Sequence, residues 1–264
     1  VRGGGTKMGW GAVPSRPVDV LLGTKRLDRI VAHRHADLTA TVQAGATLAA
    51  VNAALAAHGQ WLPLDSPFPG ATIGGLVATN DAGPSRHRHG TPRDLLIGAT
   101  LALTDGRLVT SGGHVVKNVA GYDLGRLMAG SHGGYAVIVD ATFKLMPRSL
   151  ATTTLVTDNS TAEGAAAALR AVTGSQLDPE ALDVDARCAR GALAGPVRLL
   201  ARFASGPGAV EAQVASAARL VGGQTLAGDD ERACWRAQVE APWIAPGLVA
   251  RLAWLPSDLA AVLD

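Results

Sequence analysis

The segment Arg2-Gly3-Gly4-Gly5-Thr6 joins three residues without side chains to a cation at one end and a hydroxyl at the other. Consecutive glycines let backbone N–H groups converge on one anion, so the segment has the composition of a pyrophosphate cradle. A tight turn between two strands would use the same residues. The segment matches neither G-x-G-x-x-G nor G-x-x-x-x-G-K-[ST], so a Rossmann or P-loop site is not indicated.

Two further glycine-rich segments follow. The second extends from Asp65 to Gly83, and its Pro-Gly turn predicts a helix over Thr72–Thr79. We expect the first N–H groups of that helix to be free for an anion. Alternatively, the segment packs against the Arg2–Thr6 segment, which we call the first loop. The third comprises Lys117–Leu124 and Met128–Ser131, and its alternative interpretation is a loop capped by Asp123 at a helix start.

Short strands and few helices must position these segments up to about Arg148. The predicted strands are Val18–Leu22, Arg29–His33, Leu38–Gln43, Leu95–Thr104, Arg107–Thr110 and Ala136–Leu145. The fourth and fifth form a hairpin around Asp105-Gly106. Thr47 is expected to cap a helix that runs to about His58 and stops at Gly59.

After Pro147 the pattern changes to alternating strands and helices. The predicted strands are Thr152–Thr157, Ala181–Asp185, Val197–Phe203 and Leu248–Leu255. The predicted helices are one opened by a capping box at Ser160–Glu163 and ending near Gly174, one over Pro207–Val221, and a short one around Ala233. This is the order of a ferredoxin-like sandwich, so we expect an α+β chain with domains 1–149 and 150–264.

Composition excludes several function classes. With 24 basic and 22 acidic residues, the net charge of +2 is too small for a nucleic-acid or anionic-membrane surface. No apolar run approaches the roughly 18 residues that a membrane helix needs. Cys188 and Cys234 fit neither a disulfide framework nor a metal site, so we expect ordinary buried thiols and a cytoplasmic setting. Charged residues are 17% of the chain against roughly 25% in average domains, which is consistent with a face covered by another subunit.

The three glycine-rich segments, in this order and spacing, resemble the flavin-binding domain of the vanillyl-alcohol oxidase and p-cresol methylhydroxylase family over residues 1 to about 148. Gly112–Asp123 and Arg126–Ser131 are most similar to the FAD-binding subunits of bacterial glycolate oxidases. The similarity of residues 151–264 depends on the order of elements and on Val249–Leu252. The resemblance implies a p-cresol methylhydroxylase-type FAD-binding domain followed by a ferredoxin-like α/β cap or substrate domain.

The resemblance also implies a set of FAD-binding residues. The first loop would wrap the pyrophosphate, and the second segment would add backbone N–H contacts and the Thr72 hydroxyl. Residues 80–83 would line the ribityl and isoalloxazine region, and the strand at 138–139 would meet the adenine. The implied residues are Arg2, Gly3, Gly4, Gly5, Thr6, Lys7, Pro69, Gly70, Ala71, Thr72, Gly74, Gly75, Asn80, Ala82, Gly83, Ile138 and Val139.

The chain also departs from the family. Thr6 stands where some relatives tether FAD through a histidine, so we expect non-covalent FAD. Gly134 replaces a hydroxyl residue and Tyr135 adds bulk near the cofactor, which weakens the match there. The family's first βαβ unit, which precedes the first loop, is missing from these 264 residues. We expect a strand leading into Val1 in the native protein and a C-terminal domain that is truncated.

No catalytic base is evident. Family members that oxidise hydroxy acids alone carry a C-terminal His-x-Gly-Asp-Gly-Asn-x-His-like segment, whereas this chain has no histidine after residue 150. Deprotonating an alcohol normally needs a positioned base, most often histidine. The Arg86–His89 loop would bind a carboxylate substrate, face a redox partner or simply be solvated. His132 lies near the flavin or is structural, and Lys117 and Tyr122 are interpreted as loop anchors.

The function that the resemblance implies is an FAD-dependent oxidoreductase subunit of a glycolate-oxidase-like complex. It would hold or relay electrons beside a catalytic flavin subunit and an iron–sulfur subunit, with a small 2-hydroxy acid as substrate and no metal site of its own. The complex would be cytoplasmic or peripheral to the inner membrane. The alternatives are a self-sufficient FAD-dependent hydroxy-acid or alcohol dehydrogenase and a scaffold subunit that has lost FAD.

Overall fold

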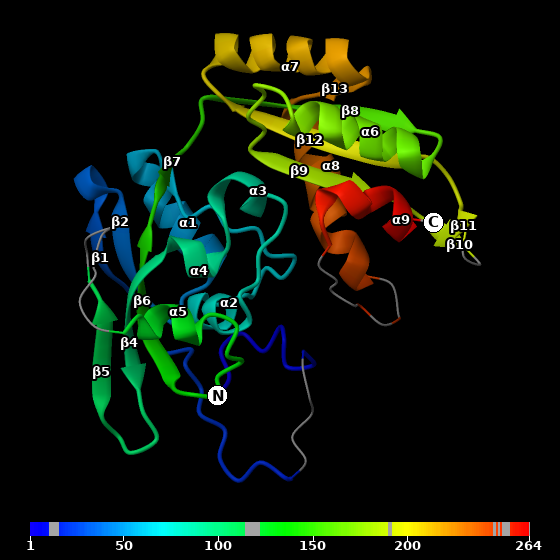
Figure 1. Ribbon diagram of the computed structural model, residues 1–264. Helices are drawn as coiled ribbons and strands as arrows, with labels where there is room; N and C mark the ends of the chain where they lie inside the picture. Colours follow the sequence, from blue (N-terminus) through cyan, green and yellow to red (C-terminus); the bar gives the residue numbers. More distant parts are fainter. Residues whose placement is uncertain are drawn as a thin grey trace. The chain divides into compact units, whose positions relative to one another are not determined.

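The computed structural model describes residues 1–10, 16–113, 122–189, 192–244, 247, 249 and 254–263. The chain divides into two compact units, Val1–Arg148 and Ser149–Asp264. Figure 1 colours the chain by sequence, so the first unit runs from blue to green and the second from green to red. Each unit is described separately.

The first unit is built on a five-stranded antiparallel sheet with the order β1-β2-β6-β4-β5 (Figure 1). Its strands are β1 (Ile30–Arg34), β2 (Thr39–Gln43), β4 (Leu96–Ala102), β5 (Leu108–Gly112) and β6 (Val137–Lys144). β6 occupies the middle of the sheet, pairing with β2 on one side and β4 on the other. The residues that lead into β6 therefore lie beside the centre of the unit.

Side-chain caps set the starts of three helices in this unit, and the sequence indicates two of them, at Thr47 and Asp123. α1 (Leu48–Leu55) begins where the Thr47 hydroxyl accepts the Ala50 amide, and a 3-10 turn, η2 (Ala56–His58), extends it to Gly59. α2 (Ile73–Thr79) begins at Thr72 and ends at Asn80, which has a φ of +48°. α5 (Leu124–Met128) begins where the Asp123 carboxylate accepts the Arg126 amide. The remaining elements are η1 (His35–Asp37), α3 (Arg86–His89), α4 (Pro92–Leu95) and the paired strands β3 (Gln60–Trp61) and β7 (Met146–Pro147).

The core of this unit holds α2 against the sheet. Ile73 and Leu76 of α2 are fully buried in the same apolar cluster as Val42 of β2 and Ala141 of β6. Burial of such side chains contributes about 1.5–3 kcal/mol each relative to exposure. The start of α2 is thereby fixed relative to the ends of β2 and β6.

The predicted strand over Val18–Leu22 is not formed. These residues have no regular secondary structure, with a bend at Asp19, and they are exposed: Val20 is 79% exposed. Only an isolated parallel bridge joins this region to the first loop: the Arg2 amide donates to the Leu22 carbonyl at 2.8 Å, and the Thr24 amide donates to the Arg2 carbonyl at 3.0 Å. Strand propensity needs a partner ladder to be expressed, and Val18–Leu22 has none in the described part of the chain.

The second unit is a four-stranded antiparallel sheet with the order β13-β8-β12-β9. Its strands are β8 (Ala151–Asn159), β9 (Ala181–Asp185), β12 (Val197–Ser205) and β13 (Gln224–Leu226). Its helices are α6 (Ala162–Thr173), α7 (Pro207–Val221), α8 (Gly228–Ile244) and α9 (Leu259–Leu263), with a 3-10 turn, η3 (Pro256–Asp258). A small hairpin of β10 (Cys188–Ala189) and β11 (Ala192–Leu193) completes the set.

Four predictions for this unit need correction. The N-cap of α6 is Thr161 rather than Ser160, because the Thr161 hydroxyl accepts the Gly164 amide. The helix around Ala233 is α8, which is 17 residues long. The fourth strand is β13, which the sequence analysis missed, and most of the strand expected at 248–255 lies outside the described residues. Cys188 is exposed on β10, whereas Cys234 is partly buried, and that burial raises the pKa of its thiol.

Alternation along the strands gives this sheet two covered faces. Leu199, Ala201 and Phe203 of β12 pack with residues of α6 and α7. Leu200, on the opposite face, packs with Trp235 of α8, and the guanidinium of Arg202 lies 5.0 Å from the Trp235 ring centroid. The α8 face is therefore partly polar.

Buried polar groups on the α8 face satisfy one another. The Glu231 carboxylate, which is 3% exposed, accepts the hydroxyls of Thr152 at 2.7 Å and Thr154 at 2.8 Å. The indole N–H of Trp235 donates to the Thr154 hydroxyl at 2.7 Å. Arg202 Nε lies 3.0 Å from a carboxylate oxygen of Glu180. Thr154 thus joins α8 to the sheet through two hydrogen bonds.

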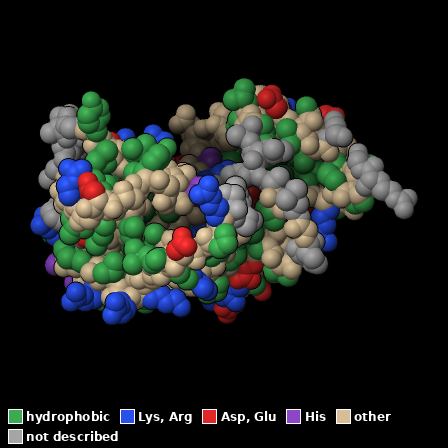
Figure 2. All heavy atoms as spheres, turned by 90° about the horizontal axis from the view of Figure 1, so that it is seen from below, with side chains coloured by type: hydrophobic (Ala, Val, Ile, Leu, Met, Phe, Trp, Pro, Cys, Tyr) green, Lys and Arg blue, Asp and Glu red, His purple; other side chains and the backbone are tan. Residues whose placement is uncertain are grey.

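The described residues contain no helix that is long and apolar enough to cross a membrane. They also contain no cluster of histidine, cysteine or carboxylate side chains arranged to hold a metal ion. The face drawn in Figure 2 carries lysine and arginine side chains distributed among apolar ones rather than gathered in one continuous patch.

We predict that Thr154→Val lowers the free energy of unfolding by about 1–3 kcal/mol, because it leaves the buried Glu231 and Trp235 groups short of a partner. Thr153→Val is the matched control, since the Thr153 hydroxyl donates only to the neighbouring Thr152 carbonyl. Urea denaturation of both variants measures the difference. Equal stabilities would contradict the role given to Thr154.

Candidate functional site

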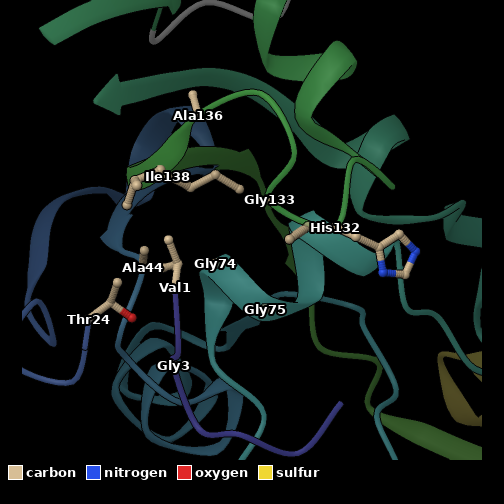
Figure 3. Close-up of a pocket in the computed structure, with 12 residues that line it drawn as sticks. Val1, Gly3, Thr24, Ala44, Gly74, Gly75, His132, Gly133, Ala136 and Ile138 are labelled. Carbon is tan, nitrogen blue, oxygen red and sulfur yellow. The ribbon is translucent and has the colours of Figure 1, made fainter. Parts of the chain in front are cut away.

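A small cavity lies where the first loop, the start of α2 and the start of β6 meet (Figure 3). Its volume is about 130 Å³. We call it the glycine-lined cavity, and its lining residues are Val1, Gly3, Thr24, Ala44, Gly74, Gly75, Ala78, His132, Gly133, Ala136, Val137 and Ile138. Of these lining side chains only His132 is ionisable, and in Figure 3 its imidazole points away from Val1 and Ile138. The cavity wall therefore has no carboxylate, lysine or arginine side chain and is built mainly from small residues.

A second, more open hollow of about 420 Å³ shares Gly3 with this cavity. It is lined by Arg2, Gly3, Leu21, Gly23, Lys25 and Arg26, and we call it the cationic hollow. Three of these six lining residues are cations and none is a carboxylate. Lys25 and Arg26 are not predicted from the sequence because they stand outside the glycine-rich segments, and the bridge between Arg2 and Gly23 brings them to the first loop.

The backbone of the first loop offers several unused donors. In the part of the chain that the structure describes, the amides of Gly3, Gly4, Gly5 and Thr6 have no hydrogen-bond acceptor. Gly5 has a φ of +76°, in the left-handed region that favours glycine. A run of amides containing such a residue can form a concave anion site. The first loop thus retains the donors that an anion would need.

The second glycine-rich segment differs, and one expectation about it is wrong. At the start of α2 the Ile73 amide donates to the Ala46 carbonyl at 2.9 Å, and the Gly74 amide donates to the Ala44 carbonyl at 2.8 Å. The Gly75 amide is 3.4 Å from the Thr72 hydroxyl oxygen. These amides are not free, because the residues after β2 supply carbonyls to the helix start. The first turn of α2 is not an open anion site.

The two loops instead interlock through their glycines. A Cβ on Gly3 would lie 2.3 Å from the Thr72 hydroxyl oxygen, and a Cβ on Gly4 would lie 1.9 Å from the Gly70 carbonyl oxygen. A Cβ on Gly74 would lie 2.8 Å from the Ala44 Cβ. Side chains at these positions would separate the backbones. The packing alternative for the second segment is therefore observed.

The structure brings only some of the implied residues to the cavities. Gly3, Gly74, Gly75 and Ile138 line the glycine-lined cavity, and Arg2 and Gly3 line the cationic hollow. The implied residues that line neither cavity are Gly4, Gly5, Thr6, Lys7, Pro69, Gly70, Ala71, Thr72, Asn80, Ala82, Gly83 and Val139.

Several of these residues have structural contacts instead. Asn80 ends α2, and its side-chain oxygen accepts the Arg93 amide at 3.1 Å. A Cβ on Gly83 would lie 2.5 Å from the Asp65 Cβ, so Gly83 permits close packing there. The Val139 carbonyl accepts the Ala44 amide at 2.9 Å.

The loop before β6 completes the cavity wall. The Gly130 amide donates to the Val77 carbonyl at 3.0 Å, and the His132 amide donates to the Ala78 carbonyl at 2.8 Å. His132 has a φ of +50°, and in Figure 3 its imidazole points away from Val1 and Ile138. Tyr135 is 62% exposed and does not line the cavity. The small lining residues Ala44, Ala78 and Ala136 cannot be recognised from the sequence, because alanine is abundant throughout.

Lys7 is turned away from both cavities. Its ammonium lies 2.8 Å from an Asp81 carboxylate oxygen, and the two side chains are 6% and 3% exposed. Burial lowers the pKa of Lys7, and the Asp81 carboxylate opposes that shift. Lys7 is thus part of a buried ion pair.

The remaining candidates lie elsewhere. Residues 86–89 form the short helix α3 rather than a loop, because Gly83–Ser85 carbonyls accept the amides of the following turn. His89 packs edge-on against Trp61, with ring centroids 5.7 Å apart. Lys117 lies outside the described residues, and Tyr122 is 93% exposed.

Comparisons with known proteins relate the first unit to FAD-binding domains. A family model described as "FAD binding domain" matches residues 1–112. The chain is 35% identical to glycolate oxidase subunit GlcE of Escherichia coli, over 87% of this chain and 61% of that protein. It is 37% identical to D-lactate dehydrogenase of Archaeoglobus fulgidus, over 56% of this chain and 33% of that protein. The match therefore spans less than two thirds of each of these two relatives.

Solved structures show a shared fold. A crystal form of alkyldihydroxyacetonephosphate synthase superposes with a TM-score of 0.72 over 91% of this chain and 50% of that chain, at 17% identity. That identity supports a statement about fold alone, and the fold is a mixed α+β one with an FAD-binding domain. Residues 1–112 therefore belong to the FAD-binding domain family, and the chain is a relative of FAD-dependent oxidoreductases.

Proposed function

We propose that this chain is the FAD-binding subunit of a glycolate-oxidase-like dehydrogenase complex and that it holds FAD without a covalent bond. The similarity to a glycolate oxidase subunit over 87% of the chain supports the subunit role. The partners would be a catalytic flavin subunit and an iron–sulfur subunit, and the substrate of the complex would be a small 2-hydroxy acid. When bound, FAD would supply a two-electron acceptor and donor.

The observation that carries this proposal is the run of amides at Gly3, Gly4, Gly5 and Thr6 without acceptors in the described structure. The adjoining cationic hollow adds Arg2, Lys25 and Arg26, with no carboxylate among its lining residues. A diphosphate needs several N–H donors and nearby positive charge, which these residues offer together. We place the FAD diphosphate at this loop.

The cavity dimensions suit one part of FAD rather than the whole molecule. Sites that enclose drug-sized ligands measure roughly 300–1,000 Å³, so the cavity of about 130 Å³ would enclose only a fragment. Its wall of small and aliphatic residues, without a carboxylate, suits a flat aromatic ring. Ile138 in this wall is the residue that we propose beside the adenine, and the rest of FAD would extend past the first loop.

The first loop contains no histidine that could tether the flavin. Thr6 occupies the position that this role would require, which supports non-covalent binding. The second unit has the β-α-β-β-α-β order of a ferredoxin-like domain, and we propose that residues 150–264 form the cap domain. Residues 151–264 contain no histidine, and we propose that a partner subunit deprotonates the substrate.

The visible spectrum of the purified full-length protein, recorded before and after acid precipitation, tests the proposal. We expect flavin absorption bands in the native protein and their release into the supernatant. Flavin that stays with the pellet would contradict non-covalent binding. A colourless protein that cannot be reconstituted with FAD would favour the scaffold alternative, and oxidation of glycolate or D-lactate by the purified chain alone would contradict the accessory role.

Neutralising the cationic hollow tests where the diphosphate binds. We predict that Lys25→Gln/Arg26→Gln weakens FAD binding by about threefold to tenfold and reduces its dependence on salt, because exposed charges are screened. Arg107→Gln, in an exposed ion pair with Asp105, is the control. Fluorescence titrations at low and high salt measure both effects. An unchanged salt dependence would place the diphosphate elsewhere.

The interlocked loops give a second prediction. Gly4→Ala should weaken FAD binding by about tenfold or more, because its Cβ would lie 1.9 Å from the Gly70 carbonyl oxygen and must displace the first loop. Gly9→Ala is the matched control, since a Cβ there has open space. Titration with FAD and the melting temperature of the apo-protein are measured for both. Equal affinities would show that the loop contact is not needed for binding.

A further inference from the structure

The ion pair between Lys7 and Asp81 is buried at the end of the first loop. Besides Lys7 Nζ at 2.8 Å, the Asp81 carboxylate accepts the Ser66 hydroxyl at 3.0 Å. Lys7 Nζ also lies 5.6 Å from the ring centroids of both Trp10 and Phe68, which meet edge to face. The pair is therefore enclosed by aromatic rings rather than by solvent.

A buried ion pair of this kind seldom stabilises a protein more than an apolar pair of the same size would. Removing one partner is strongly unfavourable, however, because the other charge remains buried and unpaired. The pair is thus a poor source of net stability but a strict geometric restraint. What it restrains follows from its place in the chain.

Lys7 directly follows the four amides of Gly3–Thr6. Asp81 directly follows Asn80, which is the C-cap residue of α2. Asp81 is itself fixed, since its amide donates to the Leu76 carbonyl at 3.1 Å. At the other end of the run, Arg2 is fixed by its bridge to Gly23. The amides are therefore held at both ends, by a backbone bridge before them and by an ion pair after them.

We propose that Lys7 is a positioning residue for FAD: its ammonium binds Asp81 and thereby fixes the Gly3–Thr6 amides relative to α2, rather than contacting the cofactor. This inference rests on the proposed function and changes the role that the sequence resemblance implies for Lys7. Fixing the donors before binding removes part of the ordering cost that association would otherwise include. Lys7 and Asp81 should then be equally important for affinity, although neither lines a cavity.

A double-mutant cycle on the full-length protein separates this role from direct contact. The variants are Lys7→Met, Asp81→Asn and the double variant, with Lys144→Met as a control for the loss of one lysine. FAD affinity is measured by fluorescence titration, and flavin circular dichroism reports the geometry of the bound ring. Thermal unfolding of each apo-protein sets a temperature at which all variants are folded.

We expect each single variant to bind FAD about tenfold more weakly or worse, because each breaks the ion pair while the other charge stays buried. The double variant should bind more tightly than either single variant, because it removes both buried charges. The dichroism of the single variants should differ from that of the wild type and return toward it in the double variant.

A direct contact predicts another pattern. Asp81→Asn would then bind FAD as well as the wild type or better, while the double variant would bind as weakly as Lys7→Met, and that result would overturn the positioning role. Wild-type affinity in both single variants would overturn it too, leaving the proposed function intact. A wild-type protein that binds no FAD would overturn both.

Discussion

Contact between two glycine-rich backbones is the constraint on which the candidate site depends. Gly4 leaves no room for a side chain between itself and the Gly70 carbonyl, and Gly3 leaves none before the Thr72 hydroxyl. The second loop is in turn fixed by α2, whose apolar face is buried against the sheet. The position of the first loop therefore follows from the core of the unit. Because the residues between the two loops are small, the first loop can pack directly on the hydrogen-bonded backbone of the second glycine-rich segment.

The two loops consequently have different chemistry. Carbonyls after β2 accept the amides of Ile73 and Gly74, so the start of α2 is committed to the protein's own structure. The first loop keeps its amides and has cations beside it, which makes it the more favourable place for an anion. The second unit supplies a sheet covered on both faces and no histidine. Cofactor binding in the first unit and substrate chemistry on a partner are consistent with this division.

Local chemistry could be predicted from the sequence, whereas pairing between distant segments could not. Thr47 caps a helix as expected, and Asp123 does so as the alternative interpretation of its segment has it, because a cap depends on residues two or three positions away. Val18–Leu22 has strand composition but lacks a ladder, and the amides at the start of α2 are occupied by carbonyls from residues 44 and 46. The sequence places Lys7 among the cofactor ligands, because its partner Asp81 is distant in the chain. Lys25 and Arg26 lie beside Arg2 in the cationic hollow because Gly23 forms a bridge with Arg2, and such pairing between distant segments is not visible in the sequence.

Amide chemical shifts of protein labelled with nitrogen-15 glycine, followed during titration with FAD, are the most direct test of diphosphate binding at the first loop. We predict that the signals of Gly3, Gly4 and Gly5 move downfield, because their free N–H groups gain phosphate acceptors. The Gly74 amide should move less, since it already donates to Ala44. Shifts confined to Gly74 and Gly75, with the first-loop glycines unchanged, would contradict diphosphate binding at the first loop.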